Sequence, residues 1–204
     1  MSLEIAKLHR DVNDAGLYRV DYWKLHQTVA IDMALYVACI WLAKHVPNVS
    51  GFLFAFALVR VQYHQHDVYH GQYCANGRLM GDVLSTFTGM SSYYWIDRNH
   101  KPHHAHVNDF RMDSNNFVFP WWKVALLPCA LPAMILKSVY YGIAAKSMIA
   151  FVLPLLFVAM CIARFQFVGF WCVCIGYVFS MMSTQVIHHK SPLTPHPNRF
   201  SPNE

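Results

Sequence analysis

The sequence predicts an all-α integral membrane protein with about four transmembrane helices, one interfacial helix and a cytoplasmic, histidine-rich cap. Three observations lead to this prediction. Of the 204 residues, 55% are hydrophobic and only 13% are charged, about half the charged fraction of typical soluble domains. The apolar residues gather in long runs. The histidines instead gather in short polar stretches where these runs end.

The first third of the chain predicts a lead-in segment followed by a helical hairpin. Residues 1–27 carry mixed charge and lack the apolar core of a signal peptide, so we expect a cytoplasmic lead-in with helical pattern. The apolar runs 28–43 and 51–63 follow. Both are shorter than the ~20 residues of a span, and flanking Trp, Tyr, Lys and His are expected to complete them. Residues 44–50 would form the turn between two antiparallel helices.

The second half is more apolar. After the polar region 64–116, the segment 119–123 (FPWWK) is typical of an interfacial belt, and nearly continuous apolar sequence follows. It predicts two or three segments at 124–143, 147–163 and 165–184, whereas the proline-rich tail 191–204 should be irregular. An even number of spans would place the polar region and His188 on one face, so we expect segment 124–143 to lie along the interface.

The basic residues orient this arrangement. Lysine and arginine are enriched on the cytoplasmic side of membrane proteins, and they are common in the lead-in and the polar region. We therefore expect the histidines to be cytoplasmic. The basic residues concerned are Lys7, Arg10, Arg19, Lys24, Arg78, Arg98, Lys101 and Arg111.

The histidine groups predict a metal site. His66 and His70 are four residues apart, which places them on one helical face. A second group holds three histidines at 100, 103 and 104, and a third holds two at 188 and 189, with Gln185 preceding them. Neutral imidazole is the commonest metal-binding side chain and suits iron, copper, zinc or nickel. More than four imidazoles exceed one tetrahedral zinc site, so two metal ions are expected.

Other classes of function fit the sequence poorly. Lysine and arginine do not form runs interleaved with aromatic residues, which argues against nucleic-acid binding. A metal transporter needs polar ligands inside its spans, and Asp32 is the one candidate. Five of the six cysteines sit in apolar runs, and we expect them to be reduced packing residues.

The histidine groups resemble the histidine boxes of membrane fatty acid desaturases, and specifically of the front-end, cytochrome b5-fusion group. The first box of that group, QHDxxH, is similar to residues 65–70, and the second, HxxHHAxxN after an aromatic stretch, is similar to residues 100–108. The resemblance runs from about residue 5 to 190. It implies a membrane desaturase domain at 28–190, with boxes at 66–70, 100–104 and 185–189.

The resemblance also implies the chemistry. Two iron ions, with O₂ as co-substrate, would remove two hydrogens from a fatty acyl chain carried by coenzyme A or a lipid. Asp67 and Asn108 would either orient the ligating imidazoles or be a surface carboxylate and a turn residue. A eukaryotic member would lie in the endoplasmic reticulum. The implied iron ligands are His66, His70, His100, His103, His104, Gln185, His188 and His189.

Two departures from the pattern leave alternatives open. The HPGG motif of a fused cytochrome b5 does not occur, so a separate donor such as cytochrome b5 or ferredoxin would supply electrons. Residues 185–189 satisfy QxxHH but follow the apolar run immediately. We therefore expect a chain truncated before the true third box, which could be a fragment or a non-catalytic paralogue. A compact enzyme closed by residues 185–189 is the alternative.

Two further alternatives concern the reaction and the neighbouring histidines. The same metal site would also serve a related lipid hydroxylase or a sphingolipid desaturase. His64 and His106 match no ligand position in the boxes, and they are expected to be solvated neighbours.

Overall fold

The computed structural model describes residues 22–69, 77–96 and 126–188, with isolated positions at 7, 11, 14, 15 and 101. Every regular element in these ranges is helical, which agrees with the all-α prediction. Leu126–Ala144 and Met148–Ser183 are long and apolar enough to cross a membrane. The number of spans and the cytoplasmic cap stay predictions. The helices are α2 (Tyr22–Leu42), α3 (Pro47–Tyr69), α4 (Gly77–Thr88), α5 (Ser92–Tyr94), α7 (Ala130–Ala144) and α8 (Met148–His188).

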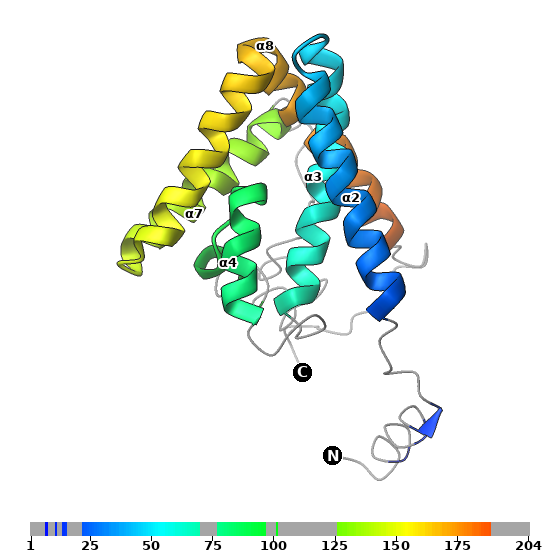
Figure 1. Ribbon diagram of the computed structural model, residues 1–204. Coiled ribbons are helices and arrows are strands. Elements are labelled where there is room, and N and C mark those ends of the chain that lie inside the picture. Colours follow the sequence, from blue (N-terminus) through cyan, green and yellow to red (C-terminus); the bar gives the residue numbers. More distant parts are fainter. Residues whose placement is uncertain are drawn as a thin grey trace, which may run out of the picture.

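Helices α2 and α3 form the predicted hairpin and lie side by side (Figure 1). The turn is shorter than expected, because α2 ends at Leu42 and α3 already begins at Pro47. Proline is favoured at the first position of a helix, where its missing N–H has no intrahelical role. The Ser50 hydroxyl then donates to the carbonyl of Val46 at 2.9 Å. Residues 47–50 therefore belong to the helix and not to the turn.

Helix α8 consists of two limbs that meet at Gln166, where the backbone leaves helical geometry with φ 60° and ψ −179°. The first limb (148–165) rises to this junction, and the second limb (167–188) descends from it behind α3 (Figure 1). A straight helix over 36 residues would be about 54 Å long, well beyond the ~30 Å hydrocarbon core. The break agrees with the predicted boundary between segments 147–163 and 165–184. The last segment, however, stays helical to His188.

Helix α3 lies at the centre and packs closely along the second limb of α8. A Cβ atom added to Gly51 would lie 2.5 Å from the carbonyl oxygen of Gly169, and one added to Gly176 would lie 2.6 Å from that of Phe52. These glycines let the two backbones approach closely, as small residues do between membrane helices. The start of α3 meets the start of the second limb, so both helices run in the same direction. The C-terminal ends of the two helices, which carry His66 and His188, therefore lie on the same side of the molecule.

Aromatic side chains hold the hairpin against α8. The ring of Phe54 lies 4.6 Å from that of Tyr36 on α2 and 4.8 Å from that of Phe165 at the end of the first limb. The buried Tyr36 hydroxyl donates to the Phe87 carbonyl at 2.8 Å. Cys161 and Cys174 are free thiols in this core. Cys39 and Cys172 are partly buried, whereas Cys129 is exposed, so the prediction of packing cysteines holds for four of the five cysteines in the described residues.

Helix α7 packs against both limbs of α8. Its Gly142 packs against Ala150 in the first limb. Met134, near the other end of α7, contacts Tyr177 in the second limb. The prediction that segment 124–143 lies along the membrane interface stays a prediction.

Candidate metal site at the end of helix α3

The last turns of α3 carry His66, the first member of the first histidine group. Nδ1 of His66 lies 3.1 Å from Oδ1 of Asp67, and both side chains are about one-third exposed. A carboxylate beside one ring nitrogen of a histidine orients the imidazole and favours one tautomer. Asp67 therefore helps to orient the imidazole of His66.

Gln65 is buried, and its side chain forms hydrogen bonds that hold this end of α3 against α4. Its side chain is 1% exposed, and Nε2 donates to the carbonyls of Gly81 at 2.9 Å and Met90 at 3.0 Å. The Thr88 hydroxyl donates to Oε1 of Gln65 at 2.9 Å. The first residue of the QHDVYH motif thus has a structural role that the sequence analysis missed. The signal was a glutamine placed one residue before a proposed ligand.

The aromatic stretch that precedes the second histidine group is anchored to α7. Tyr94 stacks on Tyr141 with ring centroids 6.1 Å apart. The backbone N–H of Ser91 donates to the Ser138 hydroxyl at 3.3 Å. Ser92 donates to the carboxylate of Asp82 on α4. Burial, with a smaller contribution from Tyr141, raises the pKa of Tyr94 to about 12. These contacts hold residues 91–94 against α4 and α7.

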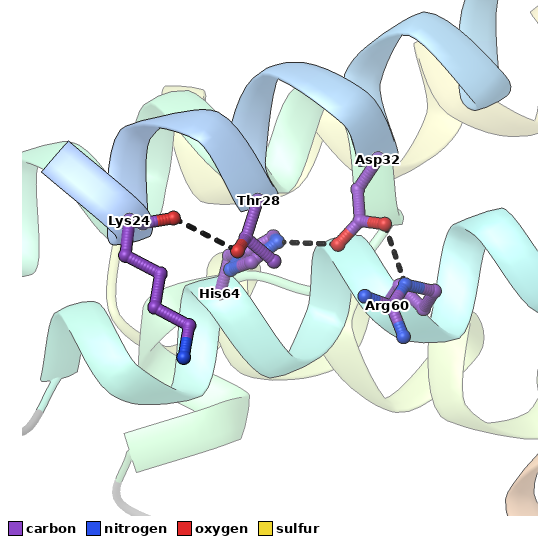
Figure 2. A network of polar contacts seen from close by, with 5 residues as sticks. All are labelled: Lys24, Thr28, Asp32, Arg60 and His64. Carbon is purple, nitrogen blue, oxygen red and sulfur yellow. Dashed lines mark hydrogen bonds and ion pairs between the residues drawn. The ribbon is translucent and has the colours of Figure 1, made fainter.

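A charged cluster between α2 and α3 corrects the expectation for His64 (Figure 2). Asp32 is 1% exposed, its Oδ1 lies 2.5 Å from Nε of Arg60, and its Oδ2 lies 2.7 Å from Nε2 of His64. His64 is only 8% exposed, so it is a buried partner of Asp32 and not a solvated neighbour. Arg60 and His64 are four residues apart and face α2 together. A sequence pattern does not show which residue of α2 they meet.

Most of the predicted ligands lie outside the described residues. Within residues 22–69, 77–96 and 126–188, no three His, Cys, Asp or Glu side chains come together as a metal site. The backbone of Gln185 and His188 lies in the last turns of α8, on the same side as His66. The ligand set therefore stays a prediction. The predicted residues outside the described ranges are His70, His100, His103, His104, His189 and Asn108.

The apolar helices and the comparisons with known proteins indicate a desaturase-like membrane protein. The chain is 24% identical over 129 residues to the Delta 8-(E)-sphingolipid desaturase of Komagataella phaffii, covering 61% of this chain and 24% of that protein. The enzyme of the same name from Lachancea kluyveri is 25% identical, covering 61% of this chain and 23% of the relative. That of Kluyveromyces lactis is 26% identical, covering 60% and 22%.

The extent of this similarity is limited. The chain spans about a quarter of the length of these curated relatives. No protein-family model and no solved structure matches it. The similarity therefore supports a lipid desaturase-like protein, and the metal and the substrate are matters for a proposal.

Proposed function

We propose that this chain carries the di-iron site of an oxygen-dependent lipid desaturase, and that its substrate is a long chain of a sphingolipid. The observation that supports the metal site is the contact of 3.1 Å between His66 Nδ1 and Asp67 Oδ1 at the end of α3. The similarity to three sphingolipid desaturases favours this substrate over a fatty acyl chain on coenzyme A.

The donor set fits iron. Imidazoles bind Fe(II) well, whereas a structural zinc site would use paired thiolates. The proposed ligands are the seven histidines of the three groups, with Gln185 as a further oxygen donor. His66 would bind through Nε2, because Asp67 takes up Nδ1. When bound, the iron pair would supply the chemistry that activates O₂ toward an unactivated methylene group.

The chain's own residues would position this centre and admit the substrate. Asp67 fixes the tautomer of His66, and Gln65 fixes the helical turn from which His66 projects. Two hydrogens leave adjacent carbons of the lipid chain. Together with O₂, two electrons and two protons, they yield a double bond and two water molecules. A separate donor such as cytochrome b5 or ferredoxin would deliver the electrons, and the lipid would enter from the bilayer on the cytoplasmic side.

Iron content tests the proposal directly. The chain is purified in mild detergent after expression with iron, and the metal is measured for wild type, His66→Ala and His45→Ala. His45 is exposed in the turn between α2 and α3, so it is a matched control. We expect about two irons per chain in wild type and in the His45 variant, and a large loss in the His66 variant.

Two outcomes would contradict the proposal. A folded wild-type protein without iron would identify a non-catalytic relative. Equal iron in His66→Ala and wild type would remove His66 from the ligand set. Product analysis with a purified electron donor then separates the reactions, since a desaturase yields a double bond and a hydroxylase retains an oxygen atom.

A further inference from the structure

Helix α4 exposes an apolar face. Leu79, Val83 and Thr86 follow the i, i+4, i+7 spacing of one helical face, and Met80 lies beside them. All four are exposed, and the side chains of Leu79, Met80 and Val83 are 60%, 42% and 51% accessible. A surface helix in water turns such a stripe toward the core and its polar residues toward the solvent. The outer face of α4 therefore suits an apolar surrounding.

Small and polar residues form most of the face that α4 turns toward the other helices. A Cβ atom added to Gly81 would lie 2.1 Å from a ring carbon of Tyr69, so a side chain would clash there. The Ser92 hydroxyl donates to the carboxylate of Asp82. Hydrogen bonds thus join this face to the bundle, while large apolar side chains are left outside. The inward residues are Gly81, Asp82, Leu84, Ser85 and Thr88.

Helix α4 starts on the side of the molecule where α3 ends, and it stops about half way along the bundle (Figure 1). Its first half contacts Tyr69, the last residue of α3. At its other end, the ring of Phe87 lies 6.0 Å from that of Tyr36 on α2. Gly89 then lies against Phe157, in the middle of the first limb of α8. The 12 residues of α4 are about 18 Å long, too short to cross a ~30 Å hydrocarbon core.

The turn that follows α4 is completely buried. Met90, Ser91 and Ser92 are each 0% exposed. The Met90 carbonyl accepts a hydrogen bond from Gln65. The backbone N–H of Ser91 donates to the hydroxyl of Ser138. Non-helical backbone is tolerated at membrane depth only where protein buries it and its polar groups are paired. This turn satisfies that requirement.

After the turn, the chain runs back toward the side from which α4 started. Ser91 bonds to Ser138 of α7. Tyr94 stacks on Tyr141, which lies about one turn further along the same helix. Helix α7 ends beside the start of the first limb of α8, where Gly142 packs against Ala150. That limb is antiparallel to α3, so α7 ends on the side where α3 ends. Helix α4 and residues 91–94 therefore enter and leave the bundle on one side.

We propose that α4 is a re-entrant half-helix, and that its outer face contacts the acyl chains of the lipid leaflet on the side where α3 ends. Lipid fits this face because Leu155 and Leu156, the neighbours of Phe157, are also exposed and apolar. They belong to the segment Met148–Ser183, which is long and apolar enough to cross a membrane. The end of α4 lies at their depth. The inference goes beyond the proposed function, because it holds with or without bound metal.

This arrangement changes the expected membrane topology. Residues 79–87 lie within the polar region 64–116, which the sequence predicts to be a cytoplasmic cap. In the arrangement proposed here, α4 lies in the bilayer and only the segments that flank the re-entrant hairpin lie in water.

Quenching by brominated lipids tests the inference. A fluorescent amino acid replaces Met80, Val83 or Thr86, one at a time, in the full chain, which is then placed in phosphatidylcholine nanodiscs. Bromine is carried either near the headgroup or near the methyl end of the acyl chains. Positions 80 and 86 are about 9 Å apart along the helix. We expect all three probes to lose fluorescence. The probe at Thr86 should respond most to bromine near the methyl end, and the probe at Met80 to bromine near the headgroup.

Two other positions provide matched controls. A probe at Leu156, 54% exposed in the first limb of α8, should lose fluorescence to brominated lipid to the same extent as the probe at Thr86. A probe at His45, exposed in the turn between α2 and α3, should instead be quenched by iodide in the water. Because every probe replaces an exposed side chain, the chains should fold, and equal helix content by circular dichroism verifies this.

Three outcomes would overturn the inference. Quenching of the α4 probes by iodide and not by brominated lipid would place the helix in water. Protection from both quenchers would show that protein covers this face, either a second copy or another segment of the chain. Quenching by brominated lipid that is equal at Met80 and Thr86 would mean that α4 lies flat at the membrane surface and does not enter it.

Discussion

Replacing Asp32 with asparagine removes the one negative charge that two α3 side chains share. The contact of Asp32 with His64 is buried: His64 Nε2 lies 2.7 Å from the carboxylate, and the His64 side chain is 11% exposed. Breaking such a pair by removing one partner costs about 3–5 kcal/mol. The amide oxygen of asparagine retains part of the hydrogen bond, so the loss of unfolding free energy from the contact with His64 should be ~2–3 kcal/mol.

The contact of Asp32 with Arg60 contributes less to the free energy of unfolding. The Arg60 side chain is 56% exposed, so its long stem lets the guanidinium turn toward polar surroundings when Asp32 is replaced. Such a pair is worth about 0–1 kcal/mol. We therefore expect Asp32→Asn to lower the free energy of unfolding by roughly 2–4 kcal/mol, and Arg60→Gln to lower it by at most about 1 kcal/mol.

The assay is unfolding by sodium dodecyl sulfate in mixed micelles, followed by tryptophan fluorescence and circular dichroism. The double variant Asp32→Leu/His64→Leu should recover most of the loss, because apolar residues can replace both partners of a buried pair at little cost. The reasoning is refuted if Arg60→Gln costs as much as Asp32→Asn, or if Asp32→Asn changes stability by less than about 0.5 kcal/mol.

Three further predictions concern the helix contacts. Gln65→Leu removes the hydrogen-bond partner of the Gly81 and Met90 carbonyls and of the Thr88 hydroxyl, so hydrogen exchange of residues 77–96 should become faster. Unchanged protection would contradict this role of Gln65, and so would the same effect in the exposed control Gln27→Leu. Gly176→Val places a methyl-bearing carbon 2.6 Å from the Phe52 carbonyl and should destabilise by about 1–3 kcal/mol, whereas exposed Ile175→Val should be nearly neutral. Because burial raises the pKa of Tyr94 to about 12, the folded state favours its neutral phenol. Stability should thus be retained below the unfolded pKa of about 10 and fall between about pH 10 and 12, a slope that Tyr94→Phe should reduce and whose persistence would count against the assignment.

Much of the helix pattern was predictable from the sequence. The runs 28–43 and 51–63 became α2 and α3, and the break at Gln166 falls within three residues of the boundary expected between the last two apolar segments. Long apolar runs interrupted by polar residues determine where helices start and stop, because unpaired backbone groups are not tolerated in an apolar environment. The turn before Pro47 was misjudged because proline ends a helix in its interior but is favoured at its first position.

The partners of the polar residues were not predictable. Asp32 looked like an isolated charge in an apolar run, and His64 looked like a solvated neighbour of the first histidine group. Both interpretations considered each residue on its own segment. The structure joins them across 32 positions of the chain, and a residue that is buried with a partner has a different role from one that is buried alone.

The sequence by itself determined the apolar helices and the groups of histidines, since composition and the 3.6-residue period are local properties of the chain. It also pointed to the lipid desaturases, a class that the distant relatives support. Only the tertiary structure decided that Gln65 joins α3 to α4, that Asp32 holds His64, and that Tyr177 of α8 donates to Gln62 of α3. Hydrogen bonds between helices depend on the rotation and depth of each helix in the bundle, and packing against several neighbours at once sets these two quantities.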